Sequence, residues 1–348
     1  MRLLSTAESD AVHRILIVKP SSLGDIIHVF PALEILKKTF PEAEFDFLVN
    51  PSFSGILEFS PVQIRKKIFF NRKNLGKLVS FLPESIKLIK TLRAEKYDLV
   101  IDFQGLFRSA VFSFFAGAKL GCAGFDQPRE KISRLFYRRR AKTSAIHAVE
   151  RNTELANSLT GSDYKTPVCD IPKHSYNAEI IDALPENFIL MLPGARWESK
   201  RFPETLFAEA AVKLSNQGIC TVLAGSSDEI PHCEKIISIS DTDPNIISLA
   251  GKTSFNDLFE LTRRAKAVVC NDSGPLHIAS ILNKDIFSFF GATNPAKTGP
   301  WNSNAHIYRL ELPCTGCLKR NCPLDGTPCH KLDASKIADD IVNMEKLK

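Results

Sequence analysis

Short runs of apolar and β-branched residues alternate along the chain with amphipathic stretches whose apolar positions recur every three to four residues. Runs of the first kind are typical of buried strands, and the second spacing is typical of helices. The predicted strands are residues 14–18, 45–49, 64–70, 97–102, 188–192, 220–224, 245–249, 267–270 and 285–290. The predicted helices are residues 26–36, 80–95, 203–217, 255–264, 275–282 and 334–345.

This alternation predicts an α/β protein whose parallel sheets are covered by helices on both faces. The pattern stops in the polar stretch 160–173 and starts again near residue 188. We therefore expect two Rossmann-like domains, residues 1–170 and 171–348. An arrangement in which the last helix packs back on the N-terminal domain stays open. Ligands of such sheets bind beyond the carboxyl ends of the strands, so the loops that follow the strands are the first candidates for a site.

The composition is that of an ordinary globular protein, because 44% of the 348 residues are hydrophobic and 24% are charged. No apolar run reaches the roughly 18 residues that a membrane-spanning helix needs, and the N-terminal stretch lacks the apolar core of a signal peptide. We therefore expect a cytoplasmic protein. Five of the nine cysteines are scattered and are expected to be small buried side chains: Cys122, Cys169, Cys220, Cys233 and Cys270.

The net charge of +6 includes basic residues that crowd the first half of the chain. Such residues form either a solvated face or a docking surface for an anionic partner. No helix-turn-helix, RNP or zinc-finger pattern accompanies them, so nucleic acid is not the expected partner. The basic residues are Arg65, Lys66, Lys67, Arg72, Lys73, Lys77, Arg138, Arg139, Arg140 and Lys142.

The loop after the first predicted strand holds the first candidate for chemistry. Gly24 gives the backbone freedom, and the N–H groups of the helix that follows can bind an anion. Asp25 stands at the start of this helix, where it is either an N-terminal cap or a general base. The GxGxxG fingerprint of dinucleotide-binding proteins is absent from this loop, which argues against a dehydrogenase.

Two loops in the second half have the composition of phosphate-binding loops. The first, residues 192–203, places Lys200 and Arg201 beside a helix start, where they either bind a diphosphate or are solvated. The second, residues 271–277, has small residues before a helix, so backbone N–H groups can approach a phosphate. Asp272 in this loop either accepts hydrogen bonds from a sugar hydroxyl or belongs to a well-capped helix.

Five segments, in order, resemble glycosyltransferase family 9, the bacterial ADP-heptose:lipopolysaccharide heptosyltransferases. They are ILIVKPSSLGDIIHVFPAL at 15–33, YDLVIDFQGLFRSA at 97–110, HAVERN at 147–152, PGARWESKRFP at 193–203 and NDSGPLHIA at 271–279. DQPRE at 126–130 and LFYRRR at 135–140 are similar to heptosyltransferase I, whereas GAR at 194–196 is nearer heptosyltransferase II. The resemblance implies the GT-B fold, in which two Rossmann-like domains face a central cleft, and an inverting transfer that needs no metal.

The resemblance also implies roles for individual residues. Asp25 is the general base that takes the proton of the acceptor hydroxyl. Lys200 binds the donor diphosphate, Asp272 the heptose and Glu229 the ribose. The N-terminal domain then binds the acceptor, and the C-terminal domain binds the nucleotide sugar. The residues that match donor-binding positions are Lys200, Asp272, Ser273, Gly274, Pro275, Glu229, Arg196 and Leu249. The residues that match acceptor-binding positions are Ser22, Gly24, Arg65, Lys66, Lys67, Gln104, Arg108 and Arg129.

The implied partners are ADP-heptose and an acceptor, which is either Kdo-bearing lipid A or the inner core of lipopolysaccharide. The enzyme would reach the inner membrane surface through this acceptor, and no nucleic acid is implied. The alternatives are a heptosyltransferase of type II, another nucleotide-sugar transferase of the same family, and a nucleotide-sugar-binding or metal-binding protein without catalysis. The presence of both Asp25 and Lys200 argues against the last of these.

The remaining four cysteines lie close together near the C-terminus: Cys314, Cys317, Cys322 and Cys329. Their spacing suits a structural zinc ion or an iron–sulfur cluster, although the gaps match no standard zinc finger. The alternatives are reduced thiols packed under a loop and a disulfide, which a reducing cytoplasm disfavours. No cofactor is expected to be required for catalysis.

Overall fold

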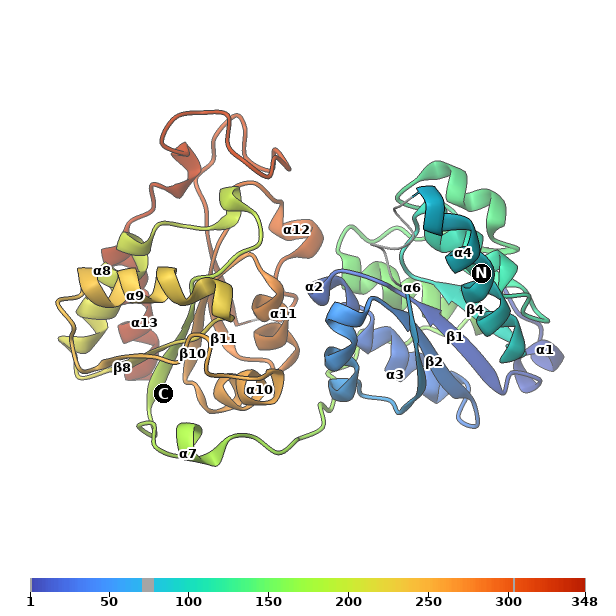
Figure 1. Cartoon of the computed structure of the whole chain (residues 1–348), viewed down its shortest axis with the longest axis horizontal. Coiled ribbons are helices and arrows are strands. Elements are labelled where there is room, and N and C mark those ends of the chain that lie inside the picture. Colours follow the sequence, from blue (N-terminus) through green and yellow to red (C-terminus); the bar gives the residue numbers. More distant parts are fainter. Residues whose placement is uncertain (1, 71–77, 303, 348) are drawn as a thin grey trace. The chain divides into compact units, whose positions relative to one another are not determined.

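The computed structural model describes residues 2–70, 78–302 and 304–347. The chain divides into two compact units, Met1–Pro172 and Lys173–Lys348, and each contains one six-stranded sheet (Figure 1). In both sheets all paired strands run parallel. The predicted α/β class is confirmed.

The N-terminal sheet has the strand order β3-β2-β1-β4-β5-β6, which is that of a doubly wound nucleotide-binding fold. Its central strands are mostly apolar and are buried except at Arg14, as strands covered on both faces must be, and the one carboxylate, Asp102, stands at the end of β4. The order reverses between β1 and β4, so the ends of these two strands are where such a sheet binds ligands. The strands are β1 (Arg14–Val18), β2 (Glu44–Val49), β3 (Ile64–Phe69), β4 (Leu99–Asp102), β5 (Cys122–Phe125) and β6 (Arg139–Ala141).

The helix predicted at residues 26–36 is two helices, because Pro31 stands at the start of the second one and its ring disfavours a continuous helix. Helix α6 ends at Gly161, whose positive φ of 75° closes the last turn. The helices of this unit are α1 (Thr6–Asp10), α2 (Leu23–Ile27), α3 (Phe30–Thr39), α4 (Leu78–Ala94), α5 (Phe107–Phe115) and α6 (Ala148–Thr160), with the 3-10 helices η1 (Pro51–Phe59) and η3 (Lys131–Phe136).

The C-terminal sheet has the order β12-β11-β10-β7-β8-β9, which is the same doubly wound order read from the other edge. Its strand order reverses between β7 and β10. Strand β12 was not predicted, because it is a short edge strand with no buried residue and so has no apolar run. The strands are β7 (Phe188–Leu192), β8 (Cys220–Leu223), β9 (Ile246–Ser248), β10 (Ala267–Asn271), β11 (Asp285–Phe289) and β12 (Ala305–Tyr308).

The last helix, α13 (Ala334–Leu347), belongs to the C-terminal unit. Its apolar residues Ile337 and Ile341 are fully buried in one core cluster with Phe207 and Leu214 of α8 (Glu204–Ser215). This core contact places α13 against α8 of its own unit. The other helices of this unit are α7 (Ala178–Ile181), α9 (Ile230–Ile239), α10 (Phe255–Arg264), α11 (Gly274–Ile281) and α12 (Pro295–Thr298), with the 3-10 helices η4 (Glu198–Lys200), η5 (Ser227–Glu229) and η6 (Pro328–His330).

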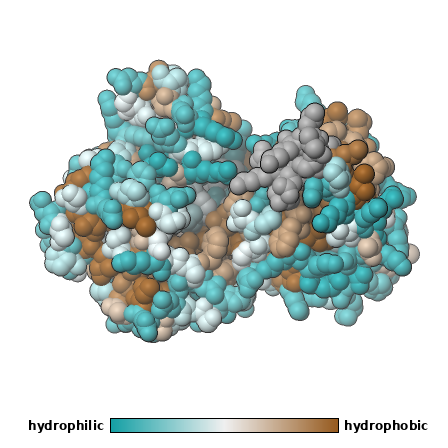
Figure 2. Space-filling model, in the orientation of Figure 1, coloured by the Kyte–Doolittle hydropathy of each residue, from teal (hydrophilic) through white to brown (hydrophobic). Residues whose placement is uncertain are grey.

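Hydrophilic residues cover much of the visible surface of both units, and apolar residues gather at the upper right of the view, over the N-terminal unit (Figure 2). Within the described ranges, no helix is long and apolar enough to cross a membrane.

Candidate functional site

Asp25 lies in the loop-to-helix turn that follows β1, at the carboxyl edge of the N-terminal sheet. Its Oδ2 accepts hydrogen bonds from the Ser22 backbone N–H at 2.8 Å and from Ser22 Oγ at 2.7 Å. This is the capping box of α2, so the structural interpretation of Asp25 holds. The carboxylate is nevertheless only partly buried, whereas the neighbouring Gly24 is buried. Asp25 is therefore a fixed carboxylate that a substrate hydroxyl can still reach.

Lys19 joins the ends of β1 and β4 beside this carboxylate. It is only 8% exposed, and its Nζ donates a hydrogen bond to the Phe103 carbonyl at 2.9 Å. Burial lowers the pKa of Lys19, while the carboxylates of Asp25 and Asp102 act to raise it. Sequence reasoning missed Lys19, because a lysine after a strand normally marks a solvated loop.

The loop after β4 is held rigidly by Asp102, which is fully buried. Burial raises the pKa of this carboxyl group, and hydrogen bonds from Tyr137, Ser109 and two backbone N–H groups oppose that shift. Gln104, in the same loop, is 8% exposed, and its Oε1 has no hydrogen-bond partner among the described residues. A buried acceptor without a partner is a common feature of a ligand-binding site.

Two of the basic residues expected at the acceptor site lie near this loop. The backbone N–H group of Arg129 lies so close to Gly105 that a Cβ there would be 3.2 Å from its nitrogen. Arg129 and Arg151 are also near enough to Lys19 to oppose its charge, which places both guanidinium groups around the Asp25 loop. Arg108 is exposed on α5, which begins after the same loop.

The cluster Arg65, Lys66 and Lys67 does not join this group. It lies on the edge strand β3, whose Lys66 faces Asp46 near the start of β2, whereas the Asp25 loop follows the opposite end of the sheet. The three side chains form ion pairs within the unit: Arg65 with Asp46 and Glu95, Lys66 with Glu95, and Lys67 with Glu58. The structure places this cluster away from the Asp25 loop, and its role at the acceptor stays a prediction, while Arg72, Lys73 and Lys77 lie outside the described residues.

In the C-terminal unit, Lys200 and Asp272 meet at the switch point between β7 and β10. Lys200 Nζ lies 2.7 Å from Asp272 Oδ2, and the Lys200 and Asp272 side chains are only 19% and 5% exposed. Thr293, which follows β11, donates its hydroxyl proton to the same carboxylate oxygen. Lys200 also lies over the Trp197 ring, 4.8 Å from its centre. Three loops at the carboxyl edge of the sheet thus build one charged centre.

The start of α11 faces the same edge of the sheet. Ser273 is its N-terminal cap residue, and Gly274 and Pro275 form its first turn. The hydroxyl of Ser273 is buried and has no hydrogen-bond partner in the described part of the chain. A helix start with an unsatisfied hydroxyl suits the oxygen atoms of a phosphate.

Glu229 packs against two glycines, Gly194 in the loop after β7 and Gly225 in the loop after β8. Its Oε2 accepts hydrogen bonds from the Ser226 N–H at 2.6 Å and from Ser226 Oγ at 3.0 Å. A Cβ on Gly194 would lie 1.5 Å from Glu229 Oε1, and one on Gly225 would lie 2.7 Å from Oε2. Leu249 is buried just beyond β9, and its N–H donates to the Leu223 carbonyl at the end of β8. Arg196 is exposed, two residues after Gly194.

We expect the substitution Gly194→Ala to weaken ADP binding about tenfold and to leave the fold intact. The new methyl group would displace the Glu229 carboxylate. If Glu229 binds the ribose as the resemblance implies, the loss of that hydrogen bond corresponds to roughly 1.5 kcal/mol. Calorimetric titration with ADP measures the change. Glu229→Gln, which keeps the side-chain volume, is the matched comparison, and normal ADP binding by Gly194→Ala would contradict the placement of Glu229.

The four C-terminal cysteines all carry free thiols, and Cys314 and Cys317 are exposed. In the part of the chain that the structure describes, no three His, Cys, Asp or Glu side chains are arranged to hold a metal ion. Cys314, Cys317 and Cys322 are nevertheless close enough to Cys329 to act on its thiol, so a zinc or iron–sulfur site at the four cysteines stays a prediction. Burial raises the pKa of Cys329, whose thiol packs against Gly291 after β11.

The cysteine-rich segment, residues 314–330, forms hydrogen bonds with the loops that hold Lys200 and Thr293. The Ser199 N–H donates to the Arg320 carbonyl at 3.0 Å, directly beside Lys200. The Leu318 N–H donates to the Ala292 carbonyl at 2.8 Å, directly beside Thr293. This connection could not be read from the sequence, because the spacing of the cysteines suggested a metal site and carried no sign of the loops they would contact.

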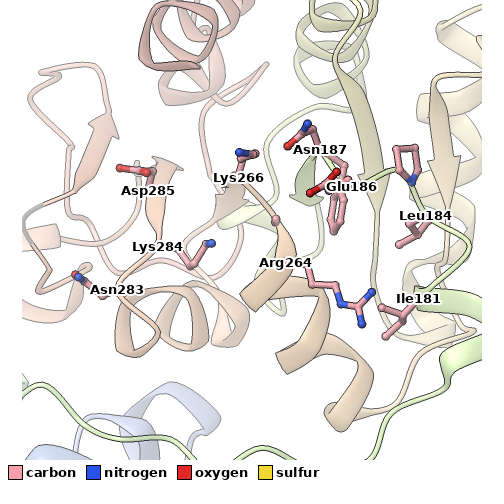
Figure 3. Close-up of a pocket in the computed structure, with 12 residues that line it drawn as sticks. Ile181, Leu184, Glu186, Asn187, Arg264, Lys266, Asn283, Lys284 and Asp285 are labelled. Carbon is pink, nitrogen blue, oxygen red and sulfur yellow. The ribbon is translucent and has the colours of Figure 1, made fainter. Parts of the chain in front are cut away.

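A cavity of about 490 Å³ lies elsewhere in the C-terminal unit. It is formed at the amino ends of β7, β10 and β11, where Glu186, Lys266 and Asp285 line it (Figure 3). None of the predicted site residues lines this cavity. Since parallel sheets bind ligands at the other edge, the charged centre at Lys200 and Asp272 is the better candidate.

Comparison with known proteins shows the family to which the chain belongs. The family described as glycosyltransferase family 9 (heptosyltransferase) matches residues 85–327. The lipopolysaccharide heptosyltransferase 1 of Pseudomonas aeruginosa is 32% identical over 90% of this chain and 88% of its own. The lipopolysaccharide heptosyltransferase 1 of Escherichia coli is 30% identical over 85% of this chain and 93% of its own.

Solved structures have the same fold. E. coli heptosyltransferase WaaC with ADP superposes with a TM-score of 0.74 at 24% identity, covering 95% of this chain and 99% of that one. E. coli ADP-heptose lps heptosyltransferase II gives a TM-score of 0.75 at 22% identity, covering 96% and 100%. The two doubly wound sheets thus correspond to the GT-B fold of these enzymes.

Proposed function

Because the chain belongs to glycosyltransferase family 9, the heptosyltransferase family, we propose that it moves heptose from ADP-heptose onto the Kdo of the lipopolysaccharide inner core. The observation that carries this proposal is the ion pair between Lys200 and Asp272 at the switch point of the C-terminal sheet. It puts a cation suited to a diphosphate beside a carboxylate suited to a sugar hydroxyl.

The C-terminal unit binds the donor in this proposal. Lys200, with Arg196 nearby, binds the diphosphate, and the turn of Ser273, Gly274 and Pro275 offers backbone N–H groups to it. Asp272 accepts a hydrogen bond from a heptose hydroxyl. Glu229 accepts hydrogen bonds from the ribose, and Leu249 borders the adenine.

The N-terminal unit binds the acceptor, and Asp25 takes the proton from its hydroxyl group. The acceptor oxygen then forms a bond to the anomeric carbon of heptose while the bond from that carbon to the ADP oxygen breaks, and ADP leaves with the electron pair. Attack from the side opposite ADP inverts the anomeric centre. Lys200 offsets the negative charge that develops on the departing diphosphate. No metal and no cofactor takes part in the proposed reaction.

The acceptor is held by groups around the Asp25 loop. Ser22 and Gly24 approach it through the backbone, and Gln104 offers its unpartnered amide oxygen. Arg129 and Arg108 supply the positive charge that the carboxylate of Kdo and the phosphates of lipid A require. The enzyme would work in the cytoplasm, at the inner membrane surface where this acceptor is anchored.

Transfer to the first Kdo, the reaction of type I, is favoured over transfer to an already heptosylated core. Four of the relatives at 29–32% identity are named lipopolysaccharide heptosyltransferase 1, whereas one at 29% is named lipooligosaccharide heptosyltransferase 2. The loop GAR at 194–196, which resembles type II, belongs to the donor site, and both types use the same donor.

A transfer assay with purified protein tests the proposal. We expect product when ADP-heptose is offered with Kdo-bearing lipid A, and little product when the acceptor already carries heptose. The reverse preference would assign type II, and a lack of product with both acceptors would overturn the choice of donor. Mass spectrometry of the acceptor gives the readout, and a reaction without ADP-heptose is the control.

A further inference from the structure

Helix α5 exposes apolar side chains on the face turned away from the core. Its inner residues Ala110 and Phe112 are buried in the core of the N-terminal unit. Phe107, Phe114 and Phe115 on the same helix are nevertheless 44%, 54% and 41% exposed. A helix that is apolar on both faces needs a second apolar surface to cover it.

The 3-10 helix η3 extends this surface. Phe136 at its end lies edge-on to Phe107 and Phe114, with ring centres 5.6 and 5.9 Å apart. Ile132 and Leu135 on η3 are 53% and 76% exposed. We call these side chains the α5–η3 patch: Phe107, Phe114, Phe115, Ile132 and Leu135. Single exposed apolar residues are ordinary, but a contiguous group of this kind normally marks an interaction surface.

Basic residues surround the α5–η3 patch. Arg108 projects from α5, Lys131 and Arg134 belong to η3, and Arg138 follows it, and all four residues are exposed. Arg134 is paired with Asp126 at 2.9 Å, and Glu130 accepts a hydrogen bond from the Phe107 N–H at 2.6 Å. The positive charges therefore exceed the negative ones at the rim of the patch.

The patch adjoins the proposed acceptor site. Helix α5 begins after the loop that holds Gln104 and Gly105, at the carboxyl edge of the sheet. The segment before η3 contains Arg129, whose backbone packs against Gly105. An apolar surface with a basic rim, next to a site for a lipid-linked sugar, has the chemistry of a membrane-docking surface.

We propose that the α5–η3 patch docks the enzyme directly on an anionic bilayer, inserting its phenylalanine and leucine side chains between the headgroups. The inference rests on the proposed function, since it presents the Asp25 loop to an acceptor anchored in the same bilayer. The basic rim supplies long-range attraction that salt screens, and the apolar side chains supply the salt-resistant part of the binding. The contact is with the lipids themselves and does not depend on the acceptor.

Vesicle flotation without acceptor tests the docking. The probes are vesicles of phosphatidylcholine alone and vesicles of equal parts phosphatidylcholine and phosphatidylglycerol. We expect the full-length protein to float with the anionic vesicles only. Phe114→Ser combined with Leu135→Ser should weaken this binding by about tenfold or more for each side chain. The variant Lys131→Gln combined with Arg138→Gln should lose the preference for phosphatidylglycerol. Val168→Ser, at a residue of the same unit that is 81% exposed, is the control.

Transfer assays separate this inference from the proposed function. With acceptor embedded in anionic vesicles, the Phe114→Ser/Leu135→Ser variant should have a kcat/KM at least tenfold below that of the parent. With a water-soluble Kdo acceptor, the two should be equal, which also verifies that the variant is folded. The docking surface would be overturned if the variant still bound anionic vesicles or if the parent did not bind them. It would also be overturned if the parent were a dimer and the variant a monomer, because the patch would then be the interface between two copies of the chain. A parent inactive with both acceptors would overturn the proposed function instead.

Discussion

The substitution Asp25→Asn is expected to lower kcat for heptose transfer by roughly 10²- to 10⁴-fold, which is the usual contribution of a general base. Asparagine can still accept the hydrogen bonds that Ser22 donates to the Asp25 carboxylate, so the start of α2 should keep its cap. It cannot take up the proton of the acceptor hydroxyl. Steady-state kinetics with saturating donor measures the loss.

The donor side supplies the control for this experiment, because Asp25 lies in the N-terminal unit and the proposed ADP site in the C-terminal unit. ADP affinity, measured by calorimetric titration, should therefore not change in Asp25→Asn. Ser22→Ala removes the hydrogen bond that Ser22 Oγ donates to the carboxylate while leaving the base in place, so a moderate loss of activity is expected there. Full turnover by Asp25→Asn would mean that Asp25 acts only as a helix cap.

The pattern of the sequence was sufficient to predict the parallel sheets and the loops that matter. Runs such as residues 15–18 and 188–192 are apolar throughout, as only strands buried on both faces need to be. In such sheets the loops after the strands lie at one edge, so Asp25, Lys200 and Asp272 could be singled out without coordinates.

The partners of these residues could not be predicted in the same way. The pair of Lys200 with Asp272 joins loops far apart in the chain, and no local pattern records it. The run of Arg65, Lys66 and Lys67 shows the opposite problem. Like charges in sequence suggest a free basic surface, but the three side chains form ion pairs with acidic residues of neighbouring elements, which the sequence does not show.

Burial of polar groups was equally hidden in the sequence. Lys19 follows an apolar strand and is itself buried, because the Phe103 carbonyl and nearby carboxylates satisfy its ammonium group. The exposed phenylalanines of α5 are the reverse case, because no helix was predicted over residues 107–115 and the sequence did not show which of its apolar residues stay exposed. In both cases the tertiary neighbours decide, and periodicity only reports which residues are apolar.

The substitutions Lys200→Ala and Asp272→Asn are expected to affect the donor differently. Without Lys200, the diphosphate loses a charge-assisted hydrogen bond of about 1.5–3 kcal/mol, so affinity for ADP should fall by roughly 10- to 100-fold. Asp272→Asn retains the volume of the side chain but removes the charge that is paired with Lys200. Affinity for ADP should then stay constant or rise, while KM for ADP-heptose rises because the heptose hydroxyl loses its ionised acceptor.

Calorimetric titration of ADP and initial rates with ADP-heptose distinguish these outcomes, and a thermal melt controls for folding. The melt matters most for Lys200→Ala, because this variant leaves the Asp272 carboxylate buried with its charge uncompensated. The double variant completes a cycle in which two side chains in contact should show a coupling of about 0.5–3 kcal/mol. If Asp272→Asn lost affinity for ADP and for ADP-heptose equally, the proposed contact between Asp272 and the heptose would be wrong. ADP lacks the heptose, so a residue that contacts only this sugar can change ADP binding only through Lys200.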